Sequence, residues 1–274
     1  MFLKFIFATV LVLFTSFCSK DENIYQPSIK LDPYKSYNEG LEAFEKNQFF
    51  FASKKFTEAE TNFNKPALAA KSAVMSSYML YRINFYVQAE ENLKRYIKKY
   101  PADKNIIYAH YLLAIMYFEQ IGSEDHDLKP LLNAEKKINF FINKYPESEY
   151  AIDLRLKKNL VINQFAAKEL HTAKYYISVQ KWVPAINRLK LIVRNYDETI
   201  FIEEALHRLV EIHYHIGLEE EAKKFANILG YNYNSSEWYK QSYKIFNKKY
   251  QIKKPSRENE KNNNLLDKII KIIK

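Results

Sequence analysis

The chain has 274 residues, 47% of them hydrophobic, so it is long enough for one large or two small domains and apolar enough to bury a core. It has only four glycines, and no two lie close enough to build a phosphate-binding loop, which excludes P-loop and dinucleotide-binding folds. The formal net charge of +10 is dispersed along the chain, which disfavours nucleic-acid binding.

The N-terminus has the pattern of a secretory signal peptide in residues 1–17. Lys4 precedes a largely apolar stretch, residues 5–14, that is too short to span a bilayer. Cys18, the single cysteine, follows directly. Its position resembles the lipidation site of bacterial lipoproteins, although Phe17 stands where a small residue is usual. The alternative is an ordinary cleaved signal with an incidental cysteine.

Ser19 follows this cysteine, and its presence there favours sorting to the outer membrane. Two acyl chains on Cys18 would hold the protein at a membrane surface. Residues 18–35 are polar and contain two prolines, so we expect them to form an extended, lipid-anchored tether.

A pattern repeated five times occupies the body of the chain. Each repeat has an alanine, an aromatic residue eleven positions later and a turn-forming residue directly after that. The alanines are Ala52, Ala89, Ala134, Ala185 and Ala222, and the aromatic residues are Phe63, Tyr100, Tyr145, Tyr196 and Tyr233. A small residue where two helices cross and a helix end twelve residues on are typical of tetratricopeptide repeats.

The fold predicted from this repeat is an all-α tetratricopeptide solenoid of about five helical hairpins with a C-terminal capping helix. Repeats 1–3 cover about 36–146, and repeats 4–5 with the cap cover about 149–250. The hairpins begin near residues 34, 67, 105, 149 and 201, and the closing helix runs from about 236 to 248. Residues 251–274 are expected to form a disordered linker followed by a short amphipathic helix.

No catalytic or metal-binding constellation is apparent among the polar residues. His213 and His215 are two positions apart on a predicted helix, so they point about 200° apart and cannot share a zinc ion. We therefore expect a binding scaffold with no enzyme activity, metal or cofactor. A cell-wall lytic enzyme would need a globular domain after the solenoid, and residues 251–274 are too few to form one.

In the order and spacing of several segments, the chain resembles the BamD family, the tetratricopeptide lipoproteins of the outer-membrane protein assembly machine. The resemblance covers Cys18 to about Tyr243. The segments that carry it are Tyr37-x-x-Gly40, Tyr96-Ile97-x-x-Tyr100-Pro101, Tyr145-Pro146-x-Ser148-x-Tyr150, Trp182-Val183-x-Ala185-Ile186-Asn187-Arg188, and Ser236-x-Trp238-Tyr239. Departures are Phe17, the missing proline after three of the repeated aromatic residues, and the amphipathic tail.

The resemblance implies a scaffold on the periplasmic face of the outer membrane. Its C-terminal half would dock a POTRA domain of BamA, alongside other lipoproteins of the machine, and its N-terminal repeats would receive unfolded β-barrel proteins. Trp182, Asn187 and Arg188 match the family segment and are candidate BamA contacts. Arginine offers a rigid fork of donors for a carboxylate, although a solvated helix surface accounts for Arg188 equally well.

Substrate contacts are expected on the first helices of repeats two and three, which line the concave face in this fold. The candidates are Tyr78, Tyr81, Arg82, Tyr111 and Tyr117, although each tyrosine could instead belong to the core. The alternative function is that of another periplasmic tetratricopeptide protein, such as a coordinator of cell-wall enzymes or division.

Overall fold

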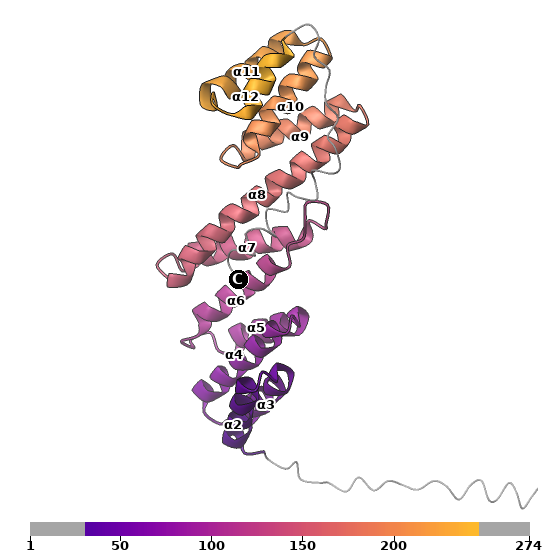
Figure 1. Ribbon diagram of the computed structural model, residues 1–274. Helices are drawn as coiled ribbons and strands as arrows, with labels where there is room; N and C mark the ends of the chain where they lie inside the picture. The colour runs from indigo at the N-terminus through magenta and orange to yellow at the C-terminus, as the bar shows by residue number, and fades with distance from the viewer. Residues whose placement is uncertain (1–30, 247–274) are drawn as a thin grey trace, which may run out of the picture.

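The computed structural model describes residues 31–246, which form eleven helices and no strand. The helices are α2 (Pro33–Glu45), α3 (Phe49–Asn62), α4 (Pro66–Arg82), α5 (Tyr86–Lys99), α6 (Ile106–Glu119), α7 (Lys129–Lys144), α8 (Glu149–Ser178), α9 (Trp182–Asn195), α10 (Ile202–His215), α11 (Glu219–Asn232) and α12 (Glu237–Ile245). Figure 1 shows the pairs stacked from α2 at one end to α11 and α12 at the other. The predicted helical solenoid is confirmed. The expected signal peptide, Cys18 and residues 251–274 lie outside the described residues.

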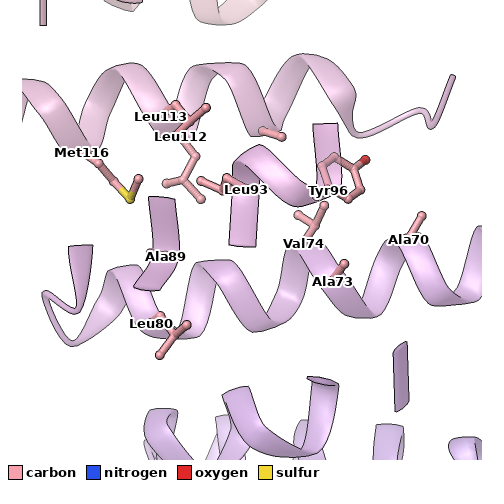
Figure 2. Packing of buried hydrophobic residues seen from close by; sticks show 11 residues of the cluster. Ala70, Ala73, Val74, Leu80, Ala89, Leu93, Tyr96, Leu112, Leu113 and Met116 are labelled. Carbon is pink, nitrogen blue, oxygen red and sulfur yellow. The ribbon is translucent and has the colours of Figure 1, made fainter. Parts of the chain in front are cut away.

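The repeated alanines lie where the two helices of each hairpin cross. All five are fully buried, and four are followed one turn later by a fully buried large side chain: Phe56, Leu93, Ile138 or Leu189. Because alanine has only a methyl group, the helices can approach closely there. Figure 2 shows one such packing, with Ala89, Leu93 and Tyr96 of α5 between α4 and α6.

The repeated aromatic residues mark the ends of the second helices. Each of the five is the C-cap residue, and its backbone N–H donates to the carbonyl four residues earlier at 2.8 to 3.0 Å. The next residue in the sequence, an asparagine, proline or aspartate, then leads the chain into the turn. The sequence pattern therefore located the helix ends because the same residue both closes the helix and packs against its neighbour.

Four of the five hairpins turn through one residue in the left-handed conformation: Asn47, Asn84, Gln180 or Gly217, with φ of 56°, 60°, 58° and 84°. In the first, the N–H of Gln48 donates to the carbonyl of Ala43 at 2.8 Å, which closes a Schellman motif, and the other three have the same bond. The third hairpin has a longer connection, residues 120–128. Its carbonyls at Gly122, Glu124 and His126 accept hydrogen bonds from Gln164 and Lys168 of α8.

Two hydrophobic clusters meet on one helix at the boundary between repeats three and four. The long helix α8 packs Ala151, Leu154 and Val161 against α6 and α7. Further along, α8 contributes Ala166, Leu170, Ala173 and Ile177 to the core around α9 and α10. A single helix of 30 residues thus joins the two parts that the repeat pattern separates.

One boundary differs from the sequence prediction. The tether was expected to reach residue 35, but α2 begins at Pro33. Asp32 caps the helix by accepting a hydrogen bond from the N–H of Tyr34 at 3.0 Å, and proline at the first helical position costs no hydrogen bond. The Tyr34 ring also meets Phe63 edge-on at 5.1 Å, which fixes this first turn on the repeat.

Candidate functional site

Tyrosine rings from neighbouring repeats form a continuous cluster, which we call the tyrosine cluster. Its members are Tyr78 and Tyr81 on α4, Tyr86 on α5, Tyr108 and Tyr111 on α6, and Tyr150 on α8. Successive ring centroids lie 4.6 to 6.5 Å apart, and the closest pair, Tyr111 and Tyr150, is stacked. The cluster thus crosses three repeats, mainly along the first helices of the hairpins, with Tyr86 added from a second helix.

Helix spacing accounts for the meeting of these rings. Tyr78 and Tyr81 are three residues apart on α4, and Tyr108 and Tyr111 have the same spacing on α6, so each pair lies on one helix face. Tyr150 joins them from the first turn of α8, whose N-cap is Ser148. All six rings are partly buried, so their edges remain accessible from solvent.

The hydroxyl groups of the cluster donate to carboxylates at its rim. Tyr81 donates to Glu119 at 2.7 Å, and Tyr111 donates to Asp153 at 2.9 Å. Burial and these carboxylates raise the pKa of both phenols, and burial with nearby tyrosines raises the pKa of Tyr108 to about 12. Tyr81, Tyr108 and Tyr111 are therefore neutral at physiological pH, and the hydroxyls of Tyr81 and Tyr111 act as hydrogen-bond donors.

Arg82 is an exposed cation at the edge of this cluster. Its guanidinium donates to the Tyr78 hydroxyl at 3.3 Å and lies 4.8 Å from the ring centroid of Phe49. Aromatic contacts on this side hold the guanidinium next to the tyrosine rings while leaving donors free for an anion.

Of the five residues predicted to contact substrate, Tyr78, Tyr81, Arg82 and Tyr111 come together, but Tyr117 does not. Tyr117 lies on another face of α6, where its hydroxyl donates to Glu90 of α5. Tyr86, Tyr108 and Tyr150 were not predicted from the sequence for this site. The three-residue spacing of Tyr108 and Tyr111 was a usable signal for Tyr108, whereas Tyr86 and Tyr150 join through contacts between repeats.

The second candidate region is α9. Arg188 and Asn187 are exposed, and Arg188 donates to Glu169 of α8 at 3.0 Å. Trp182 is partly buried against the hydrophobic core and meets the His215 ring at 5.0 Å, on a different side of the helix. Val183, one turn before Asn187, is 68% exposed. It was not predicted as a contact residue because a valine in a helix usually belongs to the hydrophobic core. The exposed face of α9 is thus defined by Val183, Asn187 and Arg188.

The histidines and acidic residues of the described part of the chain do not gather into a metal site. Among residues 31–246, no cluster of three or more His, Cys, Asp or Glu side chains could hold a metal ion. His213, half of the pair considered above, is buried and its Nδ1 contacts the Leu209 carbonyl oxygen at 2.7 Å. No described helix is long and apolar enough to cross a membrane.

Comparisons with known proteins agree with one another. A family model described as an outer membrane lipoprotein, YfiO, matches residues 30–228, which include the tyrosine cluster and α9. The chain is 34% identical over 215 residues to the outer membrane protein assembly factor BamD of Rickettsia prowazekii, covering 78% of this chain and 85% of that protein. The BamD of Caulobacter vibrioides is 34% identical over 211 residues, covering 77% of this chain and 69% of its own.

Proposed function

The chain belongs to the YfiO family of outer membrane lipoproteins, which includes BamD, and from that membership we propose that it is a scaffold of outer-membrane protein assembly. The match over most of the chain is the single observation that carries this proposal. A curved helical solenoid suits such a role because it offers extended surfaces to several partners.

We propose that the exposed face of α9 docks a POTRA domain of BamA. An exposed arginine beside an exposed valine and asparagine offers a charged contact with an apolar margin, as protein interfaces commonly do. In the free chain Arg188 is held by Glu169, so a carboxylate of the partner would take the place of Glu169. Other lipoproteins of the machine are further proposed partners.

The tyrosine cluster is the proposed contact for unfolded β-barrel proteins. Aromatic side chains are frequent in the terminal strands of such barrels, and they would stack on the partly exposed tyrosine edges. Arg82 lies beside the rings with donors available, which suits a carboxylate such as the C-terminus of an unfolded chain.

The proposed location is the periplasmic face of the outer membrane, with the chain anchored by acyl groups on Cys18. The signal-like residues 1–17 and the cysteine that follows them support this location. Two acyl chains give stable anchoring where one gives only marginal binding.

A pull-down tests the function. The chain from residue 19 onward is presented to the POTRA region of BamA from the same source, together with Arg188→Glu and a matched control, Lys98→Glu, in a distant repeat. We expect the parent and the control to bind and Arg188→Glu to lose binding. Binding that survives Arg188→Glu would move the interface, and a folded parent chain that does not bind would favour a cell-wall or division role instead.

A further inference from the structure

The second helices of repeats two and three are more basic than the first helices beside them. Helices α5 and α7 carry eight Lys/Arg and three Glu, whereas α4 and α6 carry two Lys/Arg and one Glu. The positive charge of these two repeats is therefore concentrated on their second helices, whereas the tyrosine cluster lies mainly on the first helices.

Only some of the basic side chains of α5 and α7 form ion pairs. Arg95 and Lys99 pair with Glu60, and Lys94 pairs with Glu90. Five further lysines of α5 and α7 have no carboxylate within ion-pair distance among residues 31–246: Lys98, Lys129, Lys136, Lys137 and Lys144. These lysines are available to an external anion.

The lowered pKa values of two side chains reflect the same excess of positive charge. Burial and the neighbouring Lys94 and Lys136 lower the pKa of Lys137, against the opposing effect of Glu90. On the facing helix, burial followed by the charges of Lys144 and Lys137 lowers the pKa of His110 to about 4. Lys94 of α5 and Lys137 of α7 thus repel each other.

Apolar side chains stand between these lysines on α7. Leu132, Lys136, Phe140 and Lys144 follow one another at four-residue intervals, so they form one exposed row, which we call the α7 row. Leu132 is 47% exposed and Phe140 is 43% exposed, although both are large and apolar. Lys144 lies over the Phe140 ring with its ammonium 5.3 Å from the centroid.

We propose that the α7 row, together with the adjacent Lys137, rests on a membrane surface that carries anionic phospholipids. Exposed leucine and phenylalanine interleaved with lysine on one helix face match an interfacial helix, whose apolar side chains enter the headgroup region while the lysines meet the phosphates. The proposal rests on the proposed function in one respect, the acyl anchor at Cys18. Only thirteen residues separate that cysteine from Asp32, so a chain of at most about 50 Å keeps the solenoid near the bilayer.

Vesicle co-sedimentation tests this contact. The protein is the mature chain, residues 18–274, with Cys18→Ser so that acyl chains do not supply the binding. The vesicles are phosphatidylcholine alone or phosphatidylcholine with about a third phosphatidylglycerol, a content high enough to give the lysines an anionic surface. We expect binding only to the anionic vesicles, and we expect it to weaken as salt is raised from low to physiological concentration.

The deciding variant is Lys136→Gln, Phe140→Ser and Lys144→Gln combined. It removes two charges and one ring, so we expect partition onto anionic vesicles to fall by about 20-fold or more. The matched control, Lys46→Gln, Lys65→Gln and Tyr175→Ser combined, likewise removes two lysine charges and one aromatic ring at exposed positions elsewhere and should bind like the parent. Equal binding by parent and deciding variant, or no anionic preference in the parent, would overturn the proposal.

The experiment also separates vesicle binding by the α7 row from vesicle binding by the C-terminal residues. A POTRA pull-down then separates failure of the membrane contact from failure of the proposed function. Binding driven by the basic C-terminal residues 251–274 would survive the deciding variant and so count against the proposal. The POTRA pull-down is run on the same protein: retained POTRA binding with no vesicle binding refutes the membrane contact alone, and the reverse result refutes the proposed partner alone.

Discussion

Glu60 on α3 and Arg95 on α5 form a two-pronged ion pair across the first two repeats, with N–O distances of 2.5 and 2.7 Å. The Glu60 side chain is almost completely buried, and Lys99 and the Tyr100 hydroxyl also donate to it. A buried carboxylate that satisfies several donors from the neighbouring repeat fixes the angle between the two hairpins.

Removal of one partner should therefore be costly. We expect Arg95→Ala to lower the free energy of unfolding by about 2–4 kcal/mol, since it leaves a buried carboxylate with weaker partners. Urea denaturation followed by circular dichroism measures this. Lys98→Ala, an exposed neighbour, should change stability by less than about 0.5 kcal/mol. An Arg95→Ala protein as stable as the parent would mean that the pair does not hold the repeats together.

The same pair predicts how stability depends on pH. Burial raises the pKa of Glu60, but the hydrogen bonds and charges of Arg95 and Lys99 outweigh it and lower the pKa below the ordinary 4.5. A carboxylate with a depressed folded-state pKa stabilises the protein above its unfolded-state pKa and loses this contribution as the pH falls through the folded-state value. The parent should lose stability more steeply than Glu60→Gln below about pH 4.5, as thermal unfolding at several pH values would reveal.

The repeated alanine at the crossing of α4, α5 and α6 leaves no room for a larger side chain. Ala89 is fully buried between these helices (Figure 2), so Ala89→Leu should destabilise the protein by about 1–3 kcal/mol through overpacking. Gln88→Leu adds the same side chain at the adjacent exposed position and serves as the control in chemical denaturation. If the two variants were equally stable, the alanine pattern would not reflect close packing.

The tyrosine cluster makes a prediction for substrate binding. The double variant Tyr78→Ser, Tyr81→Ser removes two adjoining rings, and it should weaken binding of a fluorescent peptide from the terminal strand of a β-barrel protein by about tenfold. Fluorescence anisotropy gives the affinity. Tyr175→Ser removes a tyrosine that is 60% exposed on α8, outside the cluster, and should bind the peptide like the parent. Equal weakening by both variants would indicate a site elsewhere.

Glu169 should act as a competitor at the α9 face. Because it holds Arg188 in the free chain, Glu169→Ala should release the guanidinium and tighten POTRA binding by up to about fivefold, the range of an exposed ion pair. Isothermal titration of parent and variant measures the change. Weaker binding by Glu169→Ala would mean that Glu169 orients Arg188 for the partner rather than competing with it.

Sequence patterns predicted the fold closely because the repeat places the same physical constraint at the same position five times. Alanine at each crossing and an aromatic C-cap at each helix end are local signals, and they located nearly every helix within a few residues. The first hairpin was expected near residue 34 and α2 begins at Pro33, but the tether was expected to reach residue 35, inside this helix, because Asp32 and Pro33, which suit an extended tether, are also a good cap and first helical residue.

The candidate sites were harder to predict. Whether a tyrosine lies in the cluster depends on which repeat faces it, so Tyr150 could not be placed from α8 alone. Tyr117 lies on a different face of α6 from Tyr111, with its hydroxyl on Glu90 of α5. The partners of Glu60 and Arg188 come from other helices, 35 and 19 residues away, and no local pattern specifies such pairs.

Helix α8 limits where the chain can be cut into fragments that keep their hydrophobic cores covered. Its first half completes the core of the third repeat and its second half begins the core of the fourth. A fragment that ends at residue 146 or begins at residue 149 would therefore expose the core that α8 shares with the third repeat. Linear repeat proteins can fray from their ends one unit at a time. Because one helix belongs to both cores, we expect the middle repeats of this chain to unfold together, after the end repeats have frayed.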